Sequence, residues 1–84
     1  MKAIVKWINP IHNNIAKIIR HTVFKGYEDI NHPYGQYSIV YTKLDNERYE
    51  MFSLSNDIPK EYLQSGNEFT IYNGPNKVAD GYII

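Results

Sequence analysis

The chain has 84 residues, which is enough for one domain with a modest hydrophobic core. Nine basic and nine acidic residues cancel. This balance argues against a general DNA- or RNA-binding protein, because such proteins normally carry an excess of positive charge. The absence of cysteine excludes disulfides and thiolate metal ligands. We therefore expect a single domain over residues 1–84.

The beginning of the chain does not have the pattern of a secretory signal peptide, because Lys6 interrupts it after three apolar residues. No apolar run approaches the roughly 18–20 residues that span a bilayer. These features predict a cytoplasmic protein with no membrane partner.

The first predicted strand covers residues 2–8, with Ala3, Val5 and Trp7 on one face. It ends at Asn9-Pro10, because proline lacks the amide that a sheet requires.

Residues 11–23 fit two descriptions. Helical spacing is found among the apolar side chains Ile11, Ile15, Ile18, Ile19 and Thr22 or Val23. Against a helix, Asn13-Asn14 and the β-branched isoleucines are weak helix formers. A short helix and an irregular loop therefore both remain open.

The middle of the chain predicts a loop, a hairpin and a helical turn. The turn-rich residues 26–35 form the loop. Two strands follow at 36–43 and 48–54, and in the first of them Tyr37, Ile39 and Tyr41 share a face. Residues 56–66 resemble one helical turn. We expect Asn56 or Asp57 to cap it, Pro59 to lie in its first turn and Gly66 to end it.

The end of the chain predicts a closing hairpin. Residues 68–72 alternate polar and apolar side chains, residues 73–76 supply the turn, and residues 77–84 form the last strand, with a glycine late in it. Five strands separated by turns indicate a mostly β protein, a small closed or partly open barrel with one or two short helical turns.

Two of these segments resemble the third domain of elongation factor Tu, a small β-barrel. The segment 20–27, Arg-His-Thr-Val-Phe-Lys-Gly-Tyr, is similar to that family's Arg-His-Thr…Phe…Gly-Tyr loop, and the closing hairpin is similar to its last two strands. The resemblance implies that residues 11–23 belong to an irregular loop of the barrel. It also implies that His21 and Tyr27 occupy tRNA-contacting positions, with Asn73 and Gly74 on a turn near the tRNA backbone.

The chain departs from that family in three ways. His21 and Tyr27 are one residue closer together, the acidic Glu28-Asp29 replaces a basic run, and the middle of the chain is shorter. The GTPase part of elongation factor Tu is absent as well, because no Gly-x-x-x-x-Gly-Lys-Ser/Thr loop is present to bind a nucleotide phosphate.

The sequence offers no catalytic or metal-binding pattern. His12, His21 and His32 are spaced too widely for a local metal site. Glu28-Asp29 lies in a loop, where two adjacent carboxylates point in different directions, and no serine has a nucleophile elbow. We therefore expect no enzyme activity, no metal and no cofactor.

The eight tyrosines are more than so small a core can bury completely. Exposed tyrosines are favoured at protein interfaces, although packing with scattered exposure is the alternative. Tyr27 and Tyr34 flank a loop too polar to be core, so we place a binding site on them and on the residues between them.

These observations predict a non-catalytic protein-interaction module, one form of which is a decoy, immunity or anti-defence protein. The alternative is an RNA- or tRNA-binding barrel, which the neutral charge disfavours. The predicted partner-binding residues are His21, Tyr27, Tyr34, Asn73 and Gly74.

Overall fold

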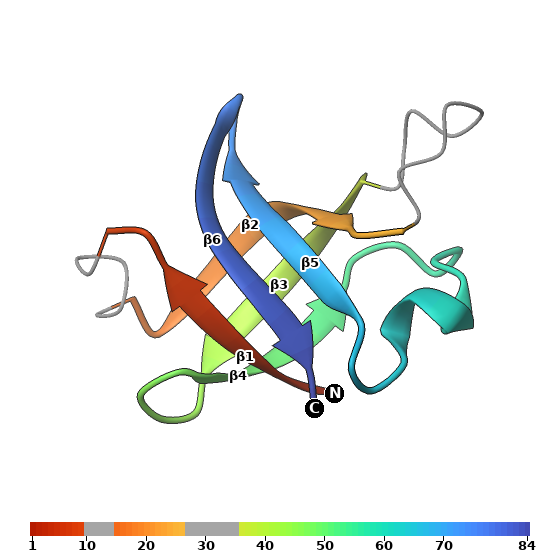
Figure 1. Cartoon of the computed structure of the whole chain (residues 1–84), viewed down its shortest axis with the longest axis horizontal. Coiled ribbons are helices and arrows are strands. Elements are labelled where there is room, and N and C mark those ends of the chain that lie inside the picture. Colours follow the sequence, from red (N-terminus) through yellow and green to blue (C-terminus); the bar gives the residue numbers. More distant parts are fainter. Residues whose placement is uncertain (10–14, 27–35) are drawn as a thin grey trace.

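The computed structural model describes residues 1–9, 15–26 and 36–84, and they form a closed antiparallel β-barrel (Figure 1). The strands of these residues are β1 Lys2–Trp7, β2 Lys17–Phe24, β3 Gln36–Lys43, β4 Arg48–Ser53, β5 Glu68–Asn73 and β6 Asn76–Ile83. A 3-10 helix, η2, covers Lys60–Leu63. The predicted fold class, a mostly β barrel with a short helical turn, is confirmed.

The strands follow one another around the barrel in the order β1-β4-β3-β2-β5-β6, and β6 pairs with β1 to close it. In Figure 1, β1, β6 and β5 form the near wall, and β2, β3 and β4 form the far wall. Closure joins the first and last strands, with Ala3 opposite Ile83. The two ends of the chain consequently lie side by side (Figure 1).

The sequence interpretation of residues 11–23 was wrong in its described part, because Lys17–Phe24 is a strand rather than a helix or an irregular loop. The same correction applies to Arg20–Phe24, the described strand portion of the segment that resembles an elongation factor loop. β2 is hydrogen-bonded to β3 on one side and to β5 on the other. Its β-branched residues favour this extended backbone. Residues 10–14 lie outside the described residues.

The predicted helical turn in residues 56–66 is confirmed over Lys60–Leu63. Pro59 occupies the position before it, and no side-chain cap hydrogen bond is formed, so the predicted capping by Asn56 or Asp57 was wrong. Within residues 1–9, 15–26 and 36–84, no helix has the length and apolar character needed to cross a membrane.

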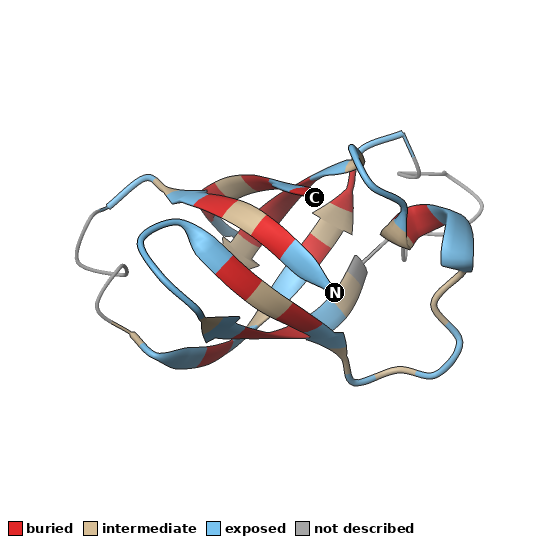
Figure 2. Ribbon diagram, turned by 90° about the horizontal axis from the view of Figure 1, so that it is seen from below, coloured by how far each residue is buried: buried red, intermediate tan, exposed pale blue. Residues whose placement is uncertain are grey.

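Buried and less buried residues alternate along the strands, because successive side chains point to opposite sides of the barrel wall (Figure 2). Ala3, Val5, Tyr41, Phe69 and Ile71 are fully buried, which confirms the faces predicted for three strands. Aromatic rings fill much of the interior.

Gly81 allows β6 to pass close to one of these rings. A Cβ atom at this position would lie 2.5 Å from Cζ of Phe69 and 2.6 Å from the carbonyl oxygen of Ile4. Both distances are far below van der Waals contact. The ring of Phe69 is in turn packed against Phe24 and Tyr41, with ring centroids 5.9 and 6.1 Å away. The glycine is therefore required by packing.

Candidate interaction surface

An apolar row crosses the outer surface of the far wall. Ile19 of β2 lies opposite Val40 of β3, and Val40 lies opposite Phe52 of β4. The side chains of Ile19 and Phe52 are 53% and 66% exposed, and Phe52 has the largest exposed fraction among the large apolar residues that the structure describes. We call Ile19, Val40 and Phe52 the apolar row.

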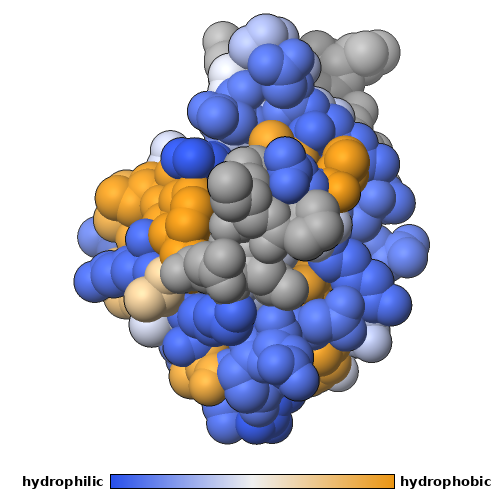
Figure 3. All heavy atoms as spheres, turned by 90° about the vertical axis from the view of Figure 1, so that its left-hand side faces the viewer, coloured by the Kyte–Doolittle hydropathy of each residue, from blue (hydrophilic) through white to orange (hydrophobic). Residues whose placement is uncertain are grey.

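Val40 is the buried member of this row. It is only 9% exposed, yet it does not belong to the core cluster inside the barrel. It alternates with Ile39 and Tyr41, which point inward. Val40 is therefore an outward residue between two larger apolar neighbours. In Figure 3, the largest orange area lies toward the side of this wall, with blue hydrophilic groups above and below it.

A polar row lies on one side of the apolar row. Thr42 in β3 is flanked by Lys17 in β2 and by Glu50 in β4. Glu50 accepts a hydrogen bond from the amino-terminal amine of Met1 at 2.9 Å. The two edges of this polar row thus carry opposite charges.

His21, Ser38 and Leu54 border the apolar row on its other side. His21 is exposed and lies opposite Ser38 of β3, and the amide of Leu54 donates to the carbonyl oxygen of Ser38 at 3.1 Å. Leu54 is 55% exposed and extends the apolar surface at this end.

Three of the five predicted binding residues lie on β2 and on the neighbouring β5–β6 hairpin. His21 of β2 is opposite Tyr72 of β5, and Tyr72 directly precedes Asn73 and Gly74 at the tip of the β5–β6 hairpin. Gly74 has φ +61°, which favours glycine, and no atom lies within 4 Å of a Cβ built there. The turn geometry alone therefore accounts for this glycine.

The other two predicted binding residues, Tyr27 and Tyr34, lie outside the described residues, and so does the loop between them. Among the described tyrosines, Tyr41, Tyr49 and Tyr62 are buried and only Tyr82 is classed as exposed, at 42%. Tyr37 is partly buried and also packs against the core, so most of the described tyrosines serve packing. The apolar row, rather than the tyrosine content, is the stronger indication of an interface.

Two hydrogen bonds, one buried and one partly buried, join polar side chains of the barrel. The hydroxyl groups of Thr22 and Tyr41 are 2.6 Å apart, and burial raises the pKa of Tyr41 far above its usual value. The indole N–H of Trp7 donates to the hydroxyl of Tyr49 at 3.0 Å. These groups satisfy one another, so we assign them to the core.

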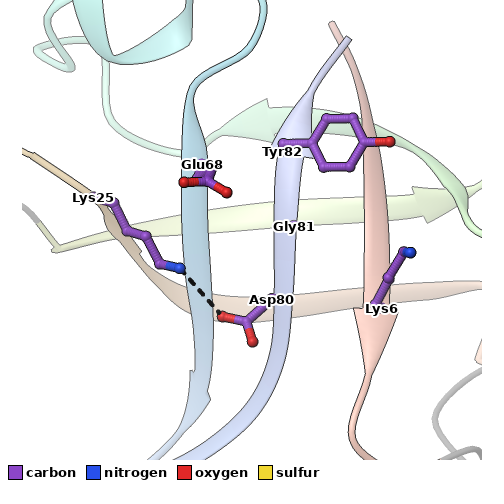
Figure 4. A pocket seen from close by; sticks show the side chains of 6 residues that line it. All are labelled: Lys6, Lys25, Glu68, Asp80, Gly81 and Tyr82. Carbon is purple, nitrogen blue, oxygen red and sulfur yellow. Dashed lines mark ion pairs between the residues drawn. The ribbon is translucent and has the colours of Figure 1, made fainter.

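The near wall carries a charged recess of about 200 Å³ on its outer surface (Figure 4). Its lining residues are Lys6, Lys25, Glu68, Asp80, Gly81 and Tyr82. Asp80 forms ion pairs with Lys77 at 2.8 Å and with Lys25 at 3.9 Å. The hydrogen bond from Lys77 is the main reason that the pKa of Asp80 is lowered. An acid with a lowered pKa is a poor proton acceptor near neutral pH, so Asp80 is unsuited to general base catalysis.

Across the described part of the chain, no group of three or more histidine, aspartate or glutamate side chains could hold a metal ion. Comparison of the chain with protein-family models, with curated proteins and with solved structures gave no match in any of the three. The interpretation of the surface therefore depends on its own chemistry.

The sequence analysis missed the apolar row. In β2, the isoleucine of the outer face was assigned to a helix or loop, so its partners across the sheet could not be identified. In β4, the adjacent apolar residues Met51 and Phe52 made the buried face ambiguous. One signal was present: if Tyr37, Ile39 and Tyr41 point inward, Val40 must be an apolar residue that points outward.

Proposed function

We propose that this chain is a non-catalytic protein-interaction domain that binds a partner protein through the outer face of β2, β3 and β4. The observation that supports the proposal is the apolar row, in which Ile19 and Phe52 remain more than half exposed while Val40 between them is buried.

Such a row has the composition of an interface centre. Aromatic residues are enriched at protein interfaces, and truncating a centrally placed one often removes a large share of the binding energy. The bordering residues Lys17, Glu50, His21 and Ser38 provide the polar rim that interfaces of this kind have. No residue of the row belongs to the core cluster, so the barrel does not need these side chains for its interior.

One form of this function is a decoy, immunity or anti-defence protein that neutralises its partner in the cytoplasm. The zero net charge and the lack of cysteine are compatible with that role. A toxin gene beside the coding sequence would favour it over the translation-related alternative.

The test compares three versions of the domain: the wild type, Phe52→Ser and the control Tyr82→Ser. Tyr82 is also aromatic and exposed, but it lies on β6 in the near wall. A partner captured by the wild type from a native lysate is identified and purified, and its affinity is measured by isothermal titration calorimetry. Phe52→Ser should weaken binding by about thirtyfold or more, the effect of losing an interface hot spot of about 2 kcal/mol. Tyr82→Ser should bind as the wild type does.

Thermal unfolding of all three proteins provides the folding control. A partner that binds Phe52→Ser as tightly as the wild type, with all three proteins folded, would contradict the proposed site.

RNA binding is a second candidate function, supported by the placement of His21 beside Tyr72. Tyr72 also lies opposite Lys77 of β6, so an imidazole, an aromatic ring and an ammonium group follow one another across three strands. Aromatic stacking and a nearby cation are the usual means of binding single-stranded RNA. Lys77 is already paired with Asp80, however, which reduces the positive charge available to phosphate.

Measuring tRNA binding at several salt concentrations distinguishes the two functions. The protein-interaction proposal predicts no saturable binding at physiological salt. Tight binding that falls steeply with salt and is weakened by Tyr72→Ala would favour RNA instead.

A further inference from the structure

We infer that the partner on this face is a second copy of the chain, bound about a two-fold axis that runs parallel to β3. This inference rests on the proposed function, because it assigns an occupant to the same apolar row. The argument uses the order of residues across the three strands and the charges at the two edges of the face.

When two identical sheets pack face to face, the two-fold axis that relates them lies in the plane between the sheets. If this axis runs parallel to β3, β3 of one copy lies over β3 of the other, and β2 of each copy lies over β4 of the other. Ile19 then faces Phe52 of the second copy, and Val40 faces Val40. The two most exposed side chains of the row, Ile19 and Phe52, therefore contact each other across the interface. This contact occurs twice, because an isologous interface repeats every contact between two different residues.

The same rotation brings opposite charges together. Lys17 at the β2 edge of the polar row faces Glu50 at the β4 edge of the second copy, again twice. Within one chain, Thr42 separates these two residues by two strand spacings, about 10 Å, so they are not direct partners there. The ion pairs would therefore form only on association.

The other simple orientation lacks this complementarity. A two-fold axis perpendicular to the strands would keep each strand over itself and exchange the two rows that border the apolar row. Lys17 would then face His21, and Glu50 would face Leu54. Neither pair joins opposite charges. The distribution of charge thus favours the axis along β3, and the zero net charge of the chain adds no overall repulsion between copies.

The size of the face indicates a weak dimer. A typical stable interface buries about 800 Å² on each partner. That would be a large share of the 5285 Å² accessible surface of this small protein. Three strands of this length span only about 14 by 26 Å, or about 360 Å² on each copy. This area is below that of a standard interface, so we expect a weak, transient dimer with a dissociation constant in the high micromolar range.

The experiment is sedimentation equilibrium over a wide concentration range at low salt. It uses the wild type, Lys17→Glu, Glu50→Lys and the double variant Lys17→Glu/Glu50→Lys. The wild type should change from monomer to dimer as its concentration rises. Each single charge reversal places like charges opposite one another at two positions and should raise the dissociation constant by about tenfold. The double variant should return it to near the wild-type value.

This rescue reports on contact between copies. Glu50→Lys also breaks the ion pair with the terminal amine of Met1, and reversing Lys17 cannot restore that pair. Recovery in the double variant therefore requires Lys17 and Glu50 to meet across the interface. As a control, Tyr82→Glu on the near wall should leave the dissociation constant unchanged. Circular dichroism and thermal unfolding verify that every variant is folded.

Three results would overturn the inference. The first is a wild type that stays monomeric up to about 1 mM, above the dissociation constant expected for a weak, transient dimer. The second is a dimer that the charge reversals do not weaken, and the third is a dimer that the double variant does not restore. If the wild type is monomeric but Phe52→Ser loses a different protein, the proposed function stands and only the second copy is excluded. If the charge reversals leave self-association unchanged and Phe52→Ser leaves partner binding unchanged, both proposals fail.

Discussion

The two walls of the barrel share one interior but have different outer surfaces. On the near wall, the charges of Lys77, Lys25 and Asp80 are paired with one another, and Thr70 also donates to Asp80 at 3.3 Å. On the far wall, Phe52 and Ile19 remain largely exposed to water. The charged groups at the centre of the near wall therefore pair with one another, whereas the far wall exposes a larger apolar area that association could bury. Packing of the shared core requires the inward residues of both walls to be apolar or paired. It places no such requirement on the outward residues, which can therefore differ between the walls according to function.

The largest effect should come from the shared interior. Phe69→Ala should destabilise the barrel by about 3–5 kcal/mol, because the removed ring is fully buried and packs on two other aromatic rings. Urea denaturation followed by circular dichroism measures this difference.

The matched control is Phe52→Ala on the outer face, which should lower the free energy of unfolding of the monomer by less than about 1 kcal/mol. A similar loss for both phenylalanines would show that Phe52 belongs to the packing of the barrel. The apolar row would then contribute to folding stability as the interior does, and the proposed difference between interior and outer face would be wrong.

An intermediate effect is expected from Gly81→Ala. The new methyl group would overlap the ring of Phe69 and the backbone of β1, and overpacking of this kind costs about 1–3 kcal/mol. This penalty exceeds the gain of about 0.4–1 kcal/mol that a Gly→Ala change gives through the unfolded state.

The crowding can be tested by repeating Gly81→Ala in a Phe69→Leu background, where the ring is gone. The cost of the alanine should be smaller there. An equal cost in both backgrounds would mean that backbone effects, and not the ring, make the glycine necessary.

The smallest effect should come from the charged near wall. Asp80→Asn should lower the free energy of unfolding by less than about 1 kcal/mol at neutral pH, because the ion-paired carboxylate is 46% exposed and screened by water. Its pKa is lowered in the folded state, mainly by the hydrogen bond with Lys77. The unfolded chain therefore takes up the proton at a higher pH, and the contribution of Asp80 is present above about pH 4 and is lost as the pH falls below it.

The difference in unfolding free energy between wild type and Asp80→Asn should consequently shrink between about pH 6 and pH 2. A difference that stayed constant over this interval would show that the ion pairs do not stabilise the folded state.

The sequence predicted those strands whose alternation was unambiguous. Residues 68–72 have a clear period of two, and the structure places Phe69 and Ile71 inside the barrel. The strand Lys17–Phe24 was missed because Ile15, Ile18, Ile19 and Thr22 satisfy helical spacing as well. Only pairing with β3 and β5, which are distant in sequence, determines that this segment is extended.

The candidate surface was less predictable than the fold for the same reason. Ile19, Val40 and Phe52 come from three strands and meet only when the register between them is set. A single sequence contains no direct information on that register. The neighbouring positions of His21, Asn73 and Gly74 likewise depend on the pairing of β2 with β5.

The seam between β1 and β6 has a consequence for the synthesis of the protein. Among the described strands of the barrel, β1 leaves the ribosome first, and one of its two hydrogen-bonded neighbours, β6, leaves last. The apolar face of β1 therefore cannot be enclosed by the barrel until β6 has been made. Pairings between such distant segments also form slowly. During this interval the newly made chain exposes Val5 and an unpaired strand edge, and this is the stage at which aggregation competes most strongly with folding.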